Sequence, residues 1–137
     1  MKHLFILIMA GLFVIGFNVL HAESTSEEAI KQMLSIPSRV IIDVRTQTEY
    51  DESHIDEAIL IPFDQIEDRI THKVPEKMTP IILYCRSGRR SEIAKATLEK
   101  IGYRQVFNAG SYESLKKVYV KPQPKKKKKG AGAKAPG

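Results

Sequence analysis

Residues that crosslink chains or bind metal ions are scarce in this sequence. Its 137 residues include one cysteine, Cys85, so no disulfide can form within the chain. The four histidines show no spacing typical of a metal site, and no internal repeat is visible. A lone cysteine is paired with another chain, buried and inert, or a working thiol. The residues around Cys85 decide between these readings.

The C-terminal stretch, residues 121–137, has almost no bulky apolar side chain. It cannot bury enough surface to offset chain entropy, so we expect a disordered tail. Its seven lysines, together with Lys2, account for the net charge of +6, because residues 23–120 hold 14 Lys and Arg against 16 Asp and Glu, a net charge of −2. Such a run attracts nucleic acid or anionic surfaces. We interpret it as a solvated tail with at most weak binding to anionic surfaces and no requirement for nucleic acid.

The one long apolar run lies at the N-terminus. Met1-Lys2-His3 precedes an apolar stretch from Leu4 to Val19, the pattern of a secretory signal peptide. Ala22 is small enough to precede a cleavage site, so we predict that residues 1–22 are a signal peptide and that the protein is exported, meeting the membrane only in transit. The alternative is an uncleaved inner-membrane anchor, for which the run falls slightly short of the roughly 18 to 20 residues needed.

Residues 23–120 have the length of one domain with a single core. Short β-branched runs alternate with amphipathic segments of helical spacing. This alternation predicts an α/β fold in which helices cover both faces of a parallel sheet, with functional groups beyond the carboxyl ends of the strands. The expected helices are 26–35, 46–50, 62–70, 91–101 and 112–118, and the expected strands are 40–44, 58–61, 80–84 and 105–107.

The segment Cys-Arg-Ser-Gly-Arg-Arg-Ser, from Cys85 to Ser91, lies between a predicted buried strand and a helix that Ser91 is expected to cap. Such a turn points several backbone N–H groups at one spot, and the helix dipole adds positive potential. Gly88 allows the curled backbone that this requires. A thiolate there is stabilised, so we expect the pKa of Cys85 to lie below that of a free cysteine. We interpret Cys85 as a reactive thiol that solvent can reach; a sulfur packed away from solvent would argue against this.

Three arginines add positive charge to the same loop and favour a dianionic substrate. We expect Arg86 and Arg89 to bind that substrate. At least one arginine is expected to be structural, and Arg90, which closes the loop, is the first choice. Its partner is predicted to be Glu92 or the acidic residues near Glu49.

Three stretches of the chain resemble the signatures of the rhodanese family of sulfurtransferases. Cys85, Gly88 and Arg90 match the family's active-site loop, Cys-x-x-Gly-x-Arg. The resemblance covers about residues 27–117. Together with the predicted signal peptide, it makes the chain most similar to the small periplasmic, phage-shock-type rhodaneses of bacteria. The other matching residues are Asp43, Val44, Arg45, Glu49, Tyr50, His54, Ile55, Ala58, Ile61 and Pro62 upstream, and Ile101, Gly102, Tyr103, Val106, Asn108, Ala109 and Gly110 downstream.

The resemblance implies a three-layer α/β/α rhodanese-like fold with a mainly parallel sheet of about five strands. It implies a periplasmic thiosulfate sulfurtransferase that needs no metal or organic cofactor, and we expect a monomer. Cys85 would take a sulfane sulfur from thiosulfate or a similar donor as a persulfide and pass it to cyanide or a thiol. His54 is expected to lie in a structural turn and not to act as a base. The residues expected to bind the donor are Arg86, Ser87, Gly88, Arg89 and Arg90.

Three other kinds of protein compete with this interpretation. A cysteine phosphatase or arsenate reductase needs five residues between its cysteine and arginine, whereas four separate Cys85 from Arg90. A non-catalytic rhodanese-like binding module is the main alternative, although such modules usually lack the cysteine. A thiol redox protein is disfavoured because no second cysteine is present to resolve a mixed disulfide.

Overall fold

The computed structural model describes residues 22–121, with side chains from residue 27 onward. The predicted signal peptide, up to residue 21, and the predicted tail, from residue 122, lie outside this range. Within it, every helix is too short or too polar to cross a bilayer.

The sheet that the structure describes has four parallel strands: β1 (Val40–Asp43), β2 (Ile59–Leu60), β3 (Ile81–Cys85) and β4 (Val106–Ser111). Their order is β2-β1-β3-β4, and each neighbouring pair is parallel. The predicted parallel α/β fold is confirmed, with four strands in the described range where about five were expected. Because β3 is a central strand, its last residue, Cys85, lies in the middle of the sheet edge where parallel α/β folds place their sites.

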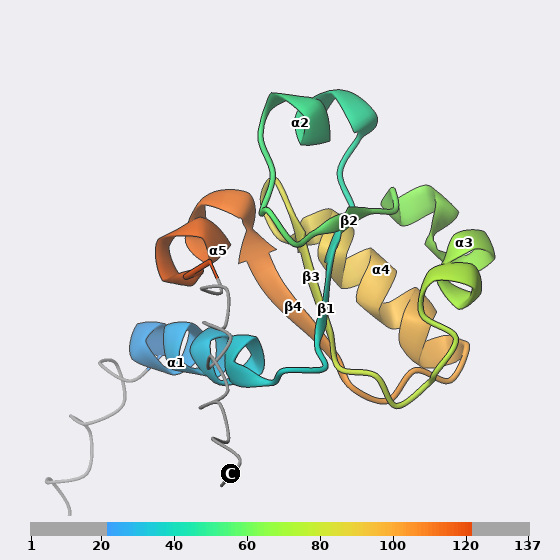
Figure 1. The fold of residues 1–137 in the computed structure, drawn as a ribbon, viewed down its shortest axis with the longest axis horizontal. Coiled ribbons are helices and arrows are strands. Elements are labelled where there is room, and N and C mark those ends of the chain that lie inside the picture. The colour runs from blue at the N-terminus through green and yellow to red at the C-terminus, as the bar shows by residue number, and fades with distance from the viewer. Residues whose placement is uncertain (1–21, 122–137) are drawn as a thin grey trace, which may run out of the picture.

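Helices cover both faces of the sheet (Figure 1). On one face lie α1 (Ala22–Ser35) and α5 (Tyr112–Val118), and on the other lie α3 (Ile66–Lys73), which η1 (Phe63–Gln65) leads into, and α4 (Arg89–Lys100). A further helix, α2 (Gln47–Glu52), covers neither face and stands beyond the carboxyl ends of the strands. The three-layer α/β/α arrangement is therefore confirmed, and α2 stands at the same end of the sheet as Cys85.

Alternate side chains of the central strands fill two separate apolar clusters. Ile41 and Ile82 pack in the cluster shared with α1 and α5, whereas Ile42 and Leu83 pack in the cluster shared with α3 and α4. All four are buried. A strand covered on both faces is apolar at every position, and not at alternate positions. This explains the continuous β-branched runs from which the strands were predicted.

The start of α4 differs from the prediction. The sequence suggests Ser91 as the N-cap, but the helix begins at Arg89 and Gly88 is its N-cap. Ser91 is the third residue of the helix and is fully buried. Its hydroxyl lies within hydrogen-bond distance of the Gly88 carbonyl (2.9 Å), because that carbonyl lies one turn back along the helix. The loop after Cys85 therefore has only three residues, 86–88.

Helix α1 also begins earlier than predicted, at Ala22 and not at residue 26. Alanine and glutamate, which open this helix, are among the residues most favourable to helix formation. The prediction of α5 as 112–118 is confirmed.

Ser53, Glu57 and Ser111 cause no backbone strain at their positions. Among the described residues positive φ is confined to glycines, and Ser53 is extended, with φ −170°. These turns therefore need no glycine.

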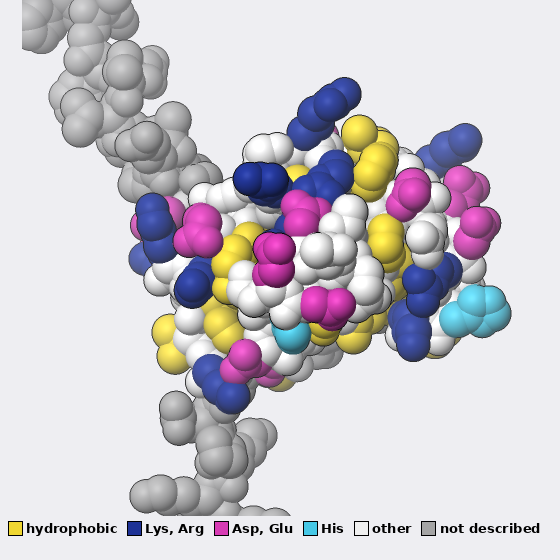
Figure 2. Space-filling view, turned by 90° about the horizontal axis from the view of Figure 1, so that it is seen from above, with side chains coloured by type: hydrophobic (Ala, Val, Ile, Leu, Met, Phe, Trp, Pro, Cys, Tyr) yellow, Lys and Arg dark blue, Asp and Glu magenta, His cyan; other side chains and the backbone are white. Residues whose placement is uncertain are grey.

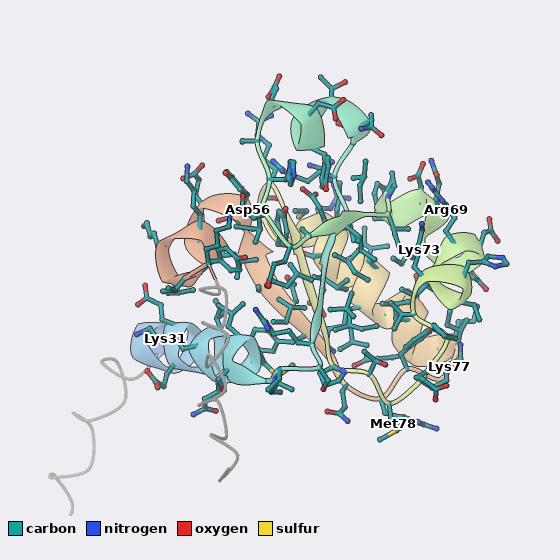
Figure 3. The ribbon with its side chains drawn as sticks, viewed as in Figure 1. Lys31, Asp56, Arg69, Lys73, Lys77 and Met78 are labelled. Atoms are coloured by element: carbon teal, nitrogen blue, oxygen red, sulfur yellow. The ribbon has the colours of Figure 1, made fainter. Side chains whose placement is uncertain are left out.

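The opposite end of the sheet, where the strands begin, is far from Cys85. The loop between α3 and β3 carries Lys77 and Met78 at the end opposite α2 (Figure 3). Met78 is 60% exposed. Arg104 lies at the same end, because its backbone N–H donates to the Lys77 carbonyl (3.1 Å). This end supplies control positions for experiments on the site.

Candidate active site

Cys85 ends β3 and lies beneath the first turn of α4. The chain turns back through residues 86–88, and Gly88 has a φ of +93°. This turn brings the Gly88 N–H within 3.0 Å of Cys85 Sγ. A Cβ at Gly88 would lie 3.3 Å from Gly110 Cα. Both the left-handed backbone and this close approach require glycine at position 88.

The hydrogen-bond donors around Sγ outweigh the effect of its burial. Burial raises the pKa of Cys85, but the Ser91 hydroxyl and the backbone N–H groups of Ser91, Ser87 and Gly88 lower it by more, so that the pKa lies below its ordinary value. The Ser91 hydroxyl is 3.5 Å from Sγ. The direction of the shift agrees with the prediction from the sequence, and its cause is the predicted convergence of donors at a helix start.

The exposure of Cys85 disagrees with the prediction. We expected a thiol that solvent can reach, but Cys85 is 0% exposed and belongs to the apolar cluster under α4. The physical reason is that Sγ points down into the sheet–helix interface instead of out of the loop. The cover is thin, because Arg86 and Ser87, two of the three loop residues, are exposed. A sulfur donor reaches Sγ only if this short loop moves.

Arg90 is held in a two-pronged ion pair with Glu49 of α2. Its two terminal nitrogens lie 2.7 and 2.8 Å from the carboxylate oxygens. Hydrogen bonding to Arg90 is the largest cause that lowers the pKa of Glu49 to about 2, and Thr46 adds to it through the capping box of α2. The pKa of Arg90 is raised mainly by Glu49, with a smaller contribution from Cys85. The predicted structural role of Arg90 is therefore seen: it ties α4 to α2 beside the sulfur.

Arg86 and Arg89 have exposed side chains. Within residues 27–121 neither one forms an ion pair with an acidic residue. Figure 2, which views the molecule from the side of α2, shows acidic and basic side chains mixed over this end. The two arginines are therefore the charged groups of the loop that remain available to an anion from solvent.

The polar residues after β1 are not part of the sulfur site. Asp43 accepts hydrogen bonds from the Arg45 side chain (2.7 and 3.0 Å), and Arg45 also donates to the Ser53 carbonyl (2.6 Å). This buried pair packs against Tyr84, which faces the opposite side of the sheet from Cys85. The pair fixes the segment that carries α2, because Arg45 joins the end of β1 to the Ser53 carbonyl that follows this helix.

His54 is bound within its own turn. Its Nδ1 lies 2.8 Å from the Tyr50 carbonyl, and its ring stacks on the Tyr50 ring at 3.8 Å between centroids. This agrees with the prediction of a structural turn.

Two residues near the sulfur, Ser91 and Asn108, have roles at the site that were not predicted from the sequence. Asn108, in β4, donates to the Gly88 carbonyl (3.1 Å) and accepts from the Gly110 N–H (2.9 Å) and from the Ser91 hydroxyl (2.8 Å). Ser91 was expected only as a helix cap, and Asn108 only as part of a family signature. The role of Ser91 could have been inferred from its position three residues after Gly88. At this spacing a serine in a helix can hydrogen-bond to the carbonyl of the preceding turn.

Comparison with known proteins agrees with this geometry. The sequence profile of the rhodanese-like domain matches residues 26–117. Thiosulfate sulfurtransferase PspE of Escherichia coli K12 is 39% identical over 80 residues, which cover 58% of this chain and 77% of PspE. The solved structure of a rhodanese with anions from E. coli superposes with a TM-score of 0.54 at 38% identity, covering 56% of this chain and 89% of that one.

The same domain also occurs inside larger proteins. A tRNA uridine(34) hydroxylase of Erwinia tasmaniensis is 34% identical over 83 residues, which cover 58% of this chain but only 24% of the hydroxylase. The similarity therefore concerns one part of that enzyme.

Proposed function

The chain belongs to the rhodanese-like family of sulfurtransferases, and on that premise we propose that Cys85 carries a sulfane sulfur from thiosulfate, or a similar donor, to cyanide or a thiol. The observation that carries the proposal is the set of donors at Sγ: the Gly88 N–H at 3.0 Å, together with Ser91 and Ser87, favours the thiolate. Only the thiolate is a competent nucleophile.

The reaction has two steps, and Cys85 is the nucleophile in the first. Its thiolate attacks the outer sulfur of thiosulfate, a new S–S bond forms, the S–S bond of the donor breaks, and sulfite leaves with the electron pair. The negative charge then resides on the outer sulfur of the Cys85 persulfide, close to the N–H groups at the start of α4. In the second step cyanide or a thiolate takes the outer sulfur and regenerates the Cys85 thiolate. This is covalent catalysis of the ping-pong type.

The five residues that follow Cys85 have three roles under this proposal. Arg86 and Arg89, which are exposed and free of ion pairs within the described range, bind the sulfonate end of the donor. Ser87 and Gly88 supply backbone N–H groups, and Arg90 holds the loop through Glu49. The short loop favours one sulfur atom over a tetrahedral phosphate.

The test uses mass spectrometry of the intact protein. After incubation with thiosulfate the chain is expected to gain the mass of one sulfur atom, and cyanide is expected to remove it with formation of thiocyanate. Cys85→Ser should abolish both events, whereas Arg104→Ala, at the far end of the sheet, should leave them unchanged. A wild-type chain that never gains sulfur would support the non-catalytic binding module instead, and hydrolysis of an aryl phosphate would point to a phosphatase.

Export and a bacterial periplasmic location also remain proposals, supported by the pattern of residues 1–22. The mass of the mature protein tests them directly, because cleavage after Ala22 removes a defined segment. A full-length chain recovered from the membrane fraction would indicate an anchor.

A further inference from the structure

The Ser91 hydroxyl has one proton and three acceptors within reach. Its Oγ lies 2.9 Å from the Gly88 carbonyl, 2.8 Å from Asn108 Oδ1 and 3.5 Å from Cys85 Sγ. Ser91 is fully buried, so bulk water does not compete for this proton. A hydroxyl donates one hydrogen bond at a time. Where the proton lies must therefore depend on which acceptor is the strongest.

The orientation of the Asn108 carboxamide is fixed by its other partners. Oδ1 faces the Gly110 N–H (2.9 Å), which can only donate. Nδ2 faces the Gly88 carbonyl (3.1 Å) and a carboxylate oxygen of Glu92 (2.8 Å), which here can only accept. A flipped carboxamide would break all three hydrogen bonds. Towards Ser91, Asn108 is therefore an acceptor only.

We propose that Asn108 is a positioning residue that gives the Ser91 hydroxyl a resting acceptor, so that this hydroxyl donates to Asn108 Oδ1 while Cys85 is a neutral thiol and to Cys85 Sγ when the sulfur is ionised. In the neutral state the S–H can donate to Ser91 Oγ, and in the ionised state the hydroxyl reverses direction. The buried sulfur then has a partner in both states, which avoids the cost of an unpaired buried group.

The arrangement has a consequence for the sulfur-transfer cycle, which rests on the proposed function. When a persulfide forms, the negative charge moves from Sγ to the outer sulfur. The Ser91 proton is then released from Sγ and returns to Asn108. The hydrogen bond between Ser91 and Asn108 therefore breaks when Sγ carries the negative charge and forms again when the charge leaves Sγ.

The test is an NMR titration of the full chain labelled at asparagine and cysteine. The sequence has two asparagines, Asn18 and Asn108, so the carboxamide signals are readily assigned. We expect the Asn108 carboxamide signals to move with the same midpoint pH as the Cβ signal of Cys85. Ser91→Ala should remove most of that movement and raise the pKa of Cys85 by about one unit, which is a tenfold loss of thiolate below the midpoint.

Ser35→Ala is the matched control. The Ser35 hydroxyl donates to the carbonyl three residues back, that of Gln32 (2.7 Å), which is the same spacing as from Ser91 to Gly88, but on exposed α1. It should change neither midpoint. Asn108 signals that ignore the ionisation of Cys85, or that move fully in Ser91→Ala, would overturn the proposal.

The first of these outcomes needs only the wild-type chain, so the proposal stays testable if a variant does not fold. No step of the titration requires a sulfur donor. A chain that titrates as expected but gains no sulfur from thiosulfate would therefore refute the proposed function alone.

Discussion

At the scale of single residues, two opposing effects act on the sulfur of Cys85. Burial favours the neutral thiol, while the donors from Ser91, Ser87 and Gly88 favour the thiolate and outweigh burial. Donors fixed by a strand end and a helix start need no rearrangement when charge appears on the sulfur. The same short loop that supplies these donors also covers the atom.

The lowered pKa predicts the pH dependence of Cys85 chemistry. Alkylation by a small reagent such as iodoacetamide should rise with pH to a plateau whose midpoint lies below that of a short cysteine peptide. Because the folded pKa is depressed, ionisation of Cys85 stabilises the fold fully above the unfolded pKa, and this stability is lost as pH falls through the folded pKa.

Burial adds a second expectation, namely that a bulky maleimide reacts with the folded protein far more slowly than iodoacetamide. Both rates are followed by intact mass and compared with those of a short cysteine peptide. Equal rates for the two reagents would mean that the loop is open in solution.

Arg86 and Arg89 are predicted to act on substrate binding. Replacing either one by alanine should raise the thiosulfate KM roughly fivefold, about 1 kcal/mol, because each is an exposed charge that contacts the anion in a screened environment. The kcat should change little, since neither residue holds the loop. Steady-state kinetics check this, with Arg104→Ala as the control. If both variants keep the wild-type KM, the two arginines have no part in the site.

At the scale of secondary-structure elements, the ion pair between Glu49 and Arg90 connects the short helix α2 to the start of α4. Thr46 and Glu49 complete a capping box, so the same carboxylate both stabilises α2 and anchors Arg90. One side chain therefore links the order of α2 to the position of the cysteine loop.

Glu49→Gln tests this link. The variant should lower the free energy of unfolding at pH 7 by about 1–2 kcal/mol, because a two-pronged, partly buried charge pair is lost. With the Glu49 pKa lowered to about 2 from 4.5, its contribution is fully present above about pH 4.5 and is lost as pH falls through about 2. Urea unfolding of both proteins at pH 7 and near pH 2 measures the difference, which should shrink at the lower pH.

Glu99→Gln provides a comparison for that experiment, because the Lys95–Glu99 pair lies one helical turn apart on α4 and is more exposed. Its loss should cost less than about 0.5 kcal/mol. A Glu49→Gln effect no larger than this would show that the connection between α2 and α4 carries little energy.

The elements could be predicted wherever burial determines the residue pattern. β1 and β3 are apolar on both faces and were predicted to within a residue. The start of α4 was misplaced because a serine near a helix start suggests an N-cap. Here Gly88, which lies close to the Gly110 backbone, is the N-cap, and Ser91 lies within the helix with its hydroxyl near the Gly88 carbonyl. Hydrogen bonds between Ser91 and Asn108, 17 residues apart, depend on how β4 pairs with β3, which no local pattern reveals.

At the scale of the whole molecule, the described residues form one layered domain and the predicted tail begins where it ends. We expect removal of residues 122–137 to leave the melting temperature within about 1 °C and the sulfur transfer rate unchanged, because their composition predicts a disordered tail. Differential scanning calorimetry and the thiocyanate assay check this. A loss of several degrees would show that the tail packs on the domain.

The burial of the sole thiol also affects how the protein reacts with oxidants. A bond between the Cys85 sulfurs of two molecules requires the atoms to meet at about 2 Å, and each is 0% exposed beneath a folded chain. Two intact copies are therefore kept apart by their own surfaces, and air should not dimerise the protein covalently. We expect Cys85 to be oxidised mainly by small oxidants, which need only a slight movement of the short loop to reach Sγ.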